Sequence, residues 1–205
     1  MLAPAELVRD FLNTYDLDSD ADELASPAEL ALWLRERGLI GRRDRASDDD
    51  LITALTLREA LRAALRHDDG ATQHNNTTQH NSAGTQHNNA AHHDSAGTQY
   101  ETPNMSQLPS LPLHIRITPH PELVPMEDGV QGALARIAAA TISPSWHRLK
   151  VCAEATCQWA FIDSSKNRSR SWCSMRVCGN RTKTRAYRAR KQGSRHLQGS
   201  NTDTV

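Results

Sequence analysis

All four cysteines of the 205-residue chain lie in one short stretch near its C-terminus, as two pairs with the same spacing. Each pair has the form Cys-x4-Cys: Cys152 with Cys157, and Cys173 with Cys178. Thiolates are soft ligands, and two such pairs that face each other supply the closed tetrahedral sulfur shell that a structural zinc ion favours. The spacing therefore predicts one structural Zn²⁺ with these four cysteines as its ligands.

Three other interpretations of the cysteines stay open. Two disulfides would need an oxidising compartment, whereas residues 1–17 lack the basic start and the uninterrupted apolar run of a signal peptide. Four unrelated buried thiols would rarely fall into two equal pairs. An iron–sulfur cluster is not excluded by a set of four cysteines alone. We favour zinc, and we expect a cytoplasmic protein.

The residues around the cysteines predict the shape of this zinc module. Residues 159–163 are aromatic and β-prone, which favours a strand, and residues 164–167 form a turn. Residues 168–172 are then expected to return as a second strand that delivers Cys173. Residues 180–192 contain no proline or glycine and favour a helix. Knuckle, hairpin, second knuckle and helix follow one another in a treble-clef-like order.

Several of these segments resemble a known family. The run Trp172-Cys173-Ser174-Met175, the later Cys178-Gly179-Asn180-Arg181 with Lys183 and Arg185 after it, and the segment from Asp163 to Ser169 are similar to the CGNR zinc finger. The resemblance covers roughly residues 149–190. Residues 7–66 also resemble the helical N-terminal domain that accompanies this finger. Members of the family are described as stress-related transcription regulators, so the resemblance implies that role here.

Charge is strongly segregated along the chain, although its formal net charge is zero. Residues 146–195 hold thirteen Lys or Arg against two acids, a balance of +11, so the remainder carries −11. This asymmetry indicates a polyanionic partner for the C-terminal module. The candidate nucleic-acid contacts are the cations of the predicted terminal helix and its approach: Arg176, Arg181, Lys183, Arg185, Arg188, Arg190 and Lys191.

At about 100° per residue, Arg185 and Arg188 fall within about 40° of Arg181 on that helix. Small residues adjoin this face, so the helix could approach a phosphate-lined groove closely. Arg181 has two open roles, because it could contact DNA or instead bond backbone carbonyls and hold the second knuckle on the helix. We expect Arg185 and Arg188 to affect binding and to leave stability unchanged.

The remainder of the chain predicts a helical domain whose core is separate from the zinc module. Apolar residues recur at helical spacing after Pro4, Ser26, Ser47 and Asp128, and residues 113–118 alternate as a half-buried strand. The predicted fold class is mainly α with minor β, a helical N-terminal domain plus a small treble-clef-like zinc module. Asn13, Arg58 and Glu59 could line a ligand pocket, but we favour a solvated or ordinary salt-bridge role for Arg58 and Glu59.

A histidine-rich tandem repeat interrupts the helical domain and offers almost nothing to bury. It could buffer metal ions, although a tolerated insertion is the simpler interpretation. The expected divisions are residues 1–67 and 108–145 for the helical domain, 68–107 for a disordered insertion, 146–192 for the zinc finger and 193–205 for a disordered tail.

Function follows from these parts as an expectation. We predict a zinc-containing DNA-binding transcription regulator; the alternative is a zinc-stabilised module for protein or RNA. The partner could then be an acidic protein or the chain's own N-terminal domain, and a homodimer is conceivable. An enzyme is disfavoured, since four thiolates close the metal shell and no nucleophile–base pair is recognisable. No apolar run is long enough for a membrane span.

Overall fold

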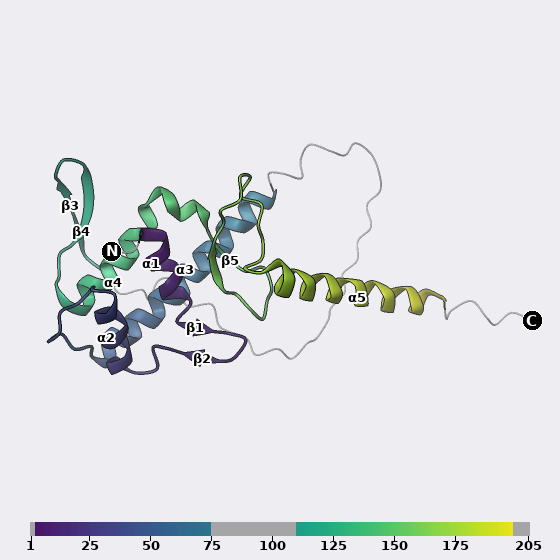
Figure 1. Ribbon diagram of the computed structural model, residues 1–205, viewed down its shortest axis with the longest axis horizontal. Helices are drawn as coiled ribbons and strands as arrows, with labels where there is room; N and C mark the ends of the chain where they lie inside the picture. The colour runs from purple at the N-terminus through teal and green to yellow at the C-terminus, as the bar shows by residue number, and fades with distance from the viewer. Residues whose placement is uncertain (1–2, 75–109, 199–205) are drawn as a thin grey trace, which may run out of the picture.

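The computed structural model describes residues 3–74 and 110–198, with side chains placed for 3–66 and 110–191. Helices dominate it, as the fold class predicts. They are α1 (Pro4–Leu12), α2 (Pro27–Glu36), α3 (Asp48–His74), α4 (Gly129–Ala139) and α5 (Asn180–Gln198). Figure 1 shows α1 to α4 gathered in one body, whereas α5 projects away from it.

The helix boundaries have local causes that the sequence already contains. The Ser26 hydroxyl accepts the backbone N–H of Glu29 and so caps α2. Ser47 likewise accepts the backbone N–H of Asp50 at the start of α3. Gly38 follows α2 with φ of +67°, a left-handed conformation that glycine adopts without strain. The predicted starts after Pro4, Ser26, Ser47 and Asp128 are confirmed.

Three short antiparallel hairpins complete the described fold. They pair β1 (Tyr15–Asp16) with β2 (Ala21–Asp22), β3 (Leu113–Ile117) with β4 (Pro121–Pro125), and β5 (Leu149–Val151) with β6 (Ala160–Ile162). The prediction that β3 is half-buried is wrong, since Ile115 is 68% and Ile117 73% exposed. The reason is that the β3–β4 hairpin stands out from the body, as Figure 1 shows, and contacts it chiefly through β4 and α4.

One hydrophobic core joins the helices to the start of the zinc module. It contains buried residues of α1, α2, α3 and α4, and it also contains Leu149, Val151 and Ala160 from the β5–β6 hairpin. Asn13 at the end of α1 reinforces this junction: its side chain donates to the Ala160 carbonyl at 2.9 Å and accepts the Ala160 N–H at 2.8 Å. The expectation of separate cores is therefore wrong, because the hairpin that carries the first knuckle is part of the helical body.

Two helices run past the predicted boundaries. Helix α3 continues to His74, seven residues beyond the expected end at residue 67, and α5 continues six residues beyond 192. Neither extension contains the proline that would force the helix to end, and the glycine in each, Gly70 and Gly193, lowers helix propensity without breaking the helix. The other parts of the predicted insertion and tail, residues 75–107 and 199–205, lie outside the described residues. No helix in the described ranges is long and apolar enough to cross a membrane.

Candidate metal centre and its basic helix

The four cysteine sulfurs converge on one point, as predicted. The Sγ atoms of Cys152, Cys157, Cys173 and Cys178 all lie within 4.8 Å of one another. The Cys157–Cys173 and Cys173–Cys178 separations are 3.6 and 3.7 Å. A tetrahedron with Zn–S bonds of about 2.3 Å has sulfurs about 3.8 Å apart, so the set fits a zinc ion. No cysteine is in a disulfide.

Secondary structure positions each pair differently. Cys152 follows β5 directly and Cys157 lies in the turn before β6, so the first pair spans the tip of the β5–β6 hairpin. The Cys152 N–H donates to the Trp159 carbonyl at 2.9 Å and closes this turn. In the second pair, Cys173 precedes η4 (Met175–Gly179), a single π-helical turn that continues into α5, and Cys178 lies within that turn. A metal ion held by these four cysteines would therefore join the hairpin of the body to the base of the projecting helix.

The predicted strand at residues 168–172 is wrong: β6 pairs with β5, upstream of the first knuckle. Asp163 explains the irregular segment that follows β6. Its fully buried carboxylate accepts the backbone N–H groups of Ser165 and Arg170, at 2.9 and 3.0 Å, and pairs with Lys150 at 3.2 Å. Backbone donors that a strand would pair are thus bonded to a side chain. Burial raises the pKa of Asp163, but these bonds outweigh it and lower the pKa to about 2.

With no cation bound, burial and crowding favour the neutral thiol form of two of the four cysteines. Burial raises the pKa of Cys157 to about 11, and it raises that of Cys173 further, helped by bonds with neighbouring sulfurs. Burial acts on Cys152 in the same direction, but backbone N–H donors outweigh it and its pKa is lowered. Thiolates bind Zn²⁺ and thiols do not, so metal binding would release protons from this cluster.

Glu154, between the first two cysteines, was not singled out by the sequence argument. Only 1% exposed, it accepts the Thr182 hydroxyl at 2.8 Å and an Arg185 Nη2–H at 2.7 Å, and both donors belong to α5. The Thr182 bond is the main reason that its pKa is lowered, while burial opposes the shift. A signal was available: Glu154 and Asp163 are the two acids among thirteen cations, and both are buried.

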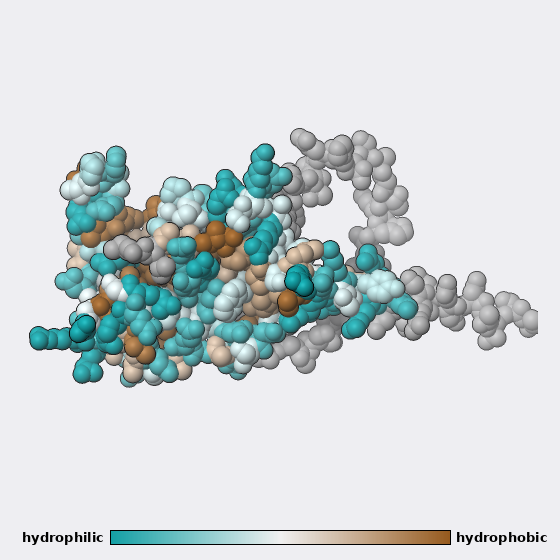
Figure 2. All heavy atoms as spheres, viewed as in Figure 1, coloured by the Kyte–Doolittle hydropathy of each residue, from teal (hydrophilic) through white to brown (hydrophobic). Residues whose placement is uncertain are grey.

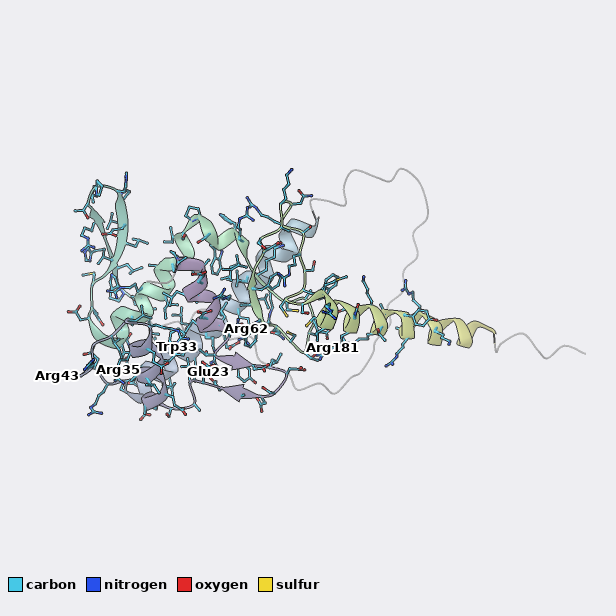
Figure 3. All side chains as sticks on the ribbon, in the orientation of Figure 1. Glu23, Trp33, Arg35, Arg43, Arg62 and Arg181 are labelled. Carbon is cyan, nitrogen blue, oxygen red and sulfur yellow. The ribbon has the colours of Figure 1, made fainter. Side chains whose placement is uncertain are left out.

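The candidate cations divide into two groups. Arg181, marked in Figure 3 at the base of α5, pairs with Asp18 of the β1–β2 hairpin at 3.2 Å and donates to Thr156. Arg185 pairs with Glu154 at 2.7 Å. The expectation that Arg185 leaves stability unchanged therefore conflicts with the structure, because it neutralises a buried carboxylate. The Arg185 side chain is nevertheless 57% exposed. The remaining candidates are exposed as well: Arg176, Lys183, Arg188, Arg190 and Lys191.

The residues that could have lined a ligand pocket in the helical domain make structural contacts instead. Arg58 is buried and forms a two-pronged ion pair with Asp22, both distances being 2.8 Å. Beside it, Arg62, labelled in Figure 3, donates to the Leu12 carbonyl at the end of α1. The salt-bridge interpretation thus describes Arg58, although this arginine is buried and not solvated. Asn13 joins the two parts of the chain as described above.

A four-thiolate metal module seated on a helical domain through a shared core defines a zinc-finger protein with a helical partner domain. Two family models match the chain. Residues 5–144 match the family ABATE, described as "Putative stress-induced transcription regulator", and residues 148–191 match the CGNR zinc finger. The chain belongs to the ABATE family and carries a CGNR zinc finger with one structural zinc site. None of the curated proteins matches the chain.

Proposed function

We propose that this protein regulates transcription by binding duplex DNA through α5, with Zn²⁺ fixing the base of that helix. The observation that carries the proposal is the composition and placement of α5. Its sequence holds seven Lys or Arg and no acid. Figure 1 shows it projecting from the body, and Figure 2 shows mostly hydrophilic residues over its described part. A cationic helix that stands clear of its own domain suits the major groove of DNA.

The metal centre supplies the rigidity that such a helix needs. The zinc ion would tie the hairpin tip to η4, and Glu154 holds the first turns of α5 through Thr182 and Arg185. Like charges along an isolated helix repel one another and destabilise it. Because the base of α5 is anchored, the helix can be formed before it binds DNA, which reduces the entropic cost of binding. The family description supports a regulatory role for that binding.

We also propose a non-enzymatic role, which is supported by the closed donor set of four cysteines, because it would leave no open metal position for substrate. A cytoplasmic location suits four free thiols. A homodimer would place two copies of α5 on two half-sites of the DNA, one from each chain.

The alternative, a module for an acidic protein or RNA, is favoured by one observation. Arg181 already pairs with Asp18, an acidic side chain of a hairpin within the same chain. A cationic helix that accepts one protein carboxylate could accept those of a partner.

Fluorescence anisotropy with a labelled 20-base-pair duplex tests the proposal. The logarithm of the association constant should fall linearly with the logarithm of the salt concentration. The slope should be about −0.9 for each phosphate contacted, so four contacts give about −3.6. Zinc-depleted protein should lose binding, because the base of α5 is then unfixed. Absence of salt-dependent binding by the zinc-loaded full chain at 50 mM salt would reject DNA as the partner. Tighter binding to a double-stranded RNA of equal length would favour the alternative.

A further inference from the structure

The two sides of α5 differ in whether their charges are already neutralised. The side that faces the body carries Arg181, Thr182 and Arg185, and all three have partners there. Both arginines of this side bind carboxylates, Arg181 that of Asp18 and Arg185 that of Glu154. A phosphate that approached them would compete with carboxylates of the protein.

The opposite side carries a second set of groups. Lys183, Tyr187 and Lys191 lie four residues apart, so they follow one another along one side of the helix at steps of about 6 Å. At about 100° per residue, Lys183 and Tyr187 lie roughly 100° and 140° round the helix from Thr182. We call Lys183, Tyr187 and Lys191 the outer face. All three are exposed, and among the described residues neither lysine has an ion-pair partner.

A groove beside the arginines is the obvious competitor for this role. It has a volume of about 610 Å³, and Arg181, Arg185 and Arg188 lie along it. DNA in that groove would nevertheless meet the exposed carboxylate of Asp18, next to Arg181. Repulsion between a phosphate and that carboxylate opposes the attraction of the arginines. Arg188 is the one arginine of the three without a carboxylate among the described residues.

We propose that duplex DNA contacts α5 through the outer face, with Lys183 and Lys191 against phosphates and Tyr187 between them against a sugar or a base edge. Arg181 and Arg185 then serve to hold the helix and contribute little to the contact. The inference rests on the proposed function and assigns the side of the helix that performs it. It reverses the assignment that the helical arrangement of arginines suggests from sequence.

Tyr187 gives the outer face a property that lysines alone lack. Tyr187 is 61% exposed, and an exposed aromatic residue on a solvent-facing helix is available for a partner. The phenol can donate a hydrogen bond to a phosphate oxygen, while the ring packs on deoxyribose. These contacts are not ionic, so they should add affinity without changing the salt slope.

Two double variants of matched charge test the assignment in the full zinc-loaded chain. Lys183→Gln with Lys191→Gln removes two outer-face cations, and Arg185→Gln with Arg188→Gln removes two from the groove side. We expect the lysine variant to flatten the salt slope by about two units and to weaken binding at least tenfold at 100 mM salt. The arginine variant should flatten it by at most about one unit, through Arg188. Zinc content and melting temperature should stay unchanged in the lysine variant.

Tyr187→Ala completes the test, because it should weaken binding about fivefold while the slope remains that of the parent. The assignment is overturned if the parent binds DNA but the lysine variant keeps the parental slope while the arginine variant loses two units. It is also overturned if Tyr187→Ala leaves affinity unchanged. A parent that fails to bind the duplex would reject the proposed function itself, which is a different result from either of these.

Discussion

The bond between Glu154 and Arg185 gives the sharpest test of how the zinc module holds its helix. Glu154 is 1% exposed, and Arg185, at the second turn of α5, reaches it at 2.7 Å. Changing Glu154 to Gln keeps the shape and one acceptor for Thr182 but removes the charge. Changing Arg185 to Ala removes the counter-ion and leaves the buried carboxylate with two hydroxyl donors, Thr182 and Thr156.

The expected magnitude follows from the unequal burial of the two partners. A hydrogen bond to a charged group contributes about 1.5–3 kcal/mol when it is well shielded, whereas exposed ion pairs contribute about 0.2–1 kcal/mol. The Arg185 side chain is 57% exposed, so water screens its half of the interaction. We therefore expect a coupling free energy of about 1–2 kcal/mol between the two residues. Each single variant should destabilise the module by at least that amount.

A double-mutant cycle measures this coupling. The parent, Glu154→Gln, Arg185→Ala and the double variant are unfolded with urea in the presence of zinc and followed by far-ultraviolet circular dichroism. Arg188→Ala is the matched control: it lies one turn further along α5 and has no carboxylate partner among the described residues, so its coupling to Glu154 should be near zero. A Glu154–Arg185 coupling below about 0.3 kcal/mol, or one equal to that of Arg188, would refute the anchoring role.

Three further outcomes are expected. Cys173→Ser should abolish zinc binding and the helicity of α5, while α1 to α4 persist because their core contains none of the four cysteines; loss of all helicity by circular dichroism would contradict this. Asp163→Asn should destabilise the protein by about 2 kcal/mol at pH 7. The depressed pKa of Asp163, about 2, makes its contribution complete above about pH 4 and lost towards pH 2, so the gap between parent and variant should close over that range. Deleting residues 75–104 should preserve zinc content and melting temperature, since that sequence offers little apolar surface and loop closure depends weakly on length; an insoluble variant would show otherwise.

Features that depend on neighbouring residues could be predicted from the sequence. Ser26 lies three residues before Glu29, and Ser47 three before Asp50, so each helix start is encoded within one turn. The four cysteines are likewise a local signal, because the spacing within each pair fixes a knuckle. The donor set then determines the preferred metal with no knowledge of the surrounding fold.

Features that depend on distant residues were missed. Strand β6 pairs with β5, which precedes the first cysteine pair. The local sequence of β6 does not show whether its partner is β5 or the later segment at residues 168–172. The buried carboxylate of Asp163 makes that difference, through bonds that only the folded chain displays. Asn13 and Ala160 are 147 residues apart, yet their two hydrogen bonds join the zinc module to α1. A single asparagine in a helical segment carries no pattern that announces such a contact.

In the terminal helix, contacts with residues distant in the sequence decide which cations are available to a partner. A helical projection places Arg181, Arg185 and Arg188 together, but it does not say which side of the helix faces the protein. That side is decided by Asp18 and Glu154, one on a remote hairpin and the other inside the first knuckle. Two of the three arginines in this densest group of cations are therefore already paired with carboxylates of the protein. If α5 binds DNA as we propose, the availability of each charge, and not its density in the sequence, should govern which side of the helix makes the contact.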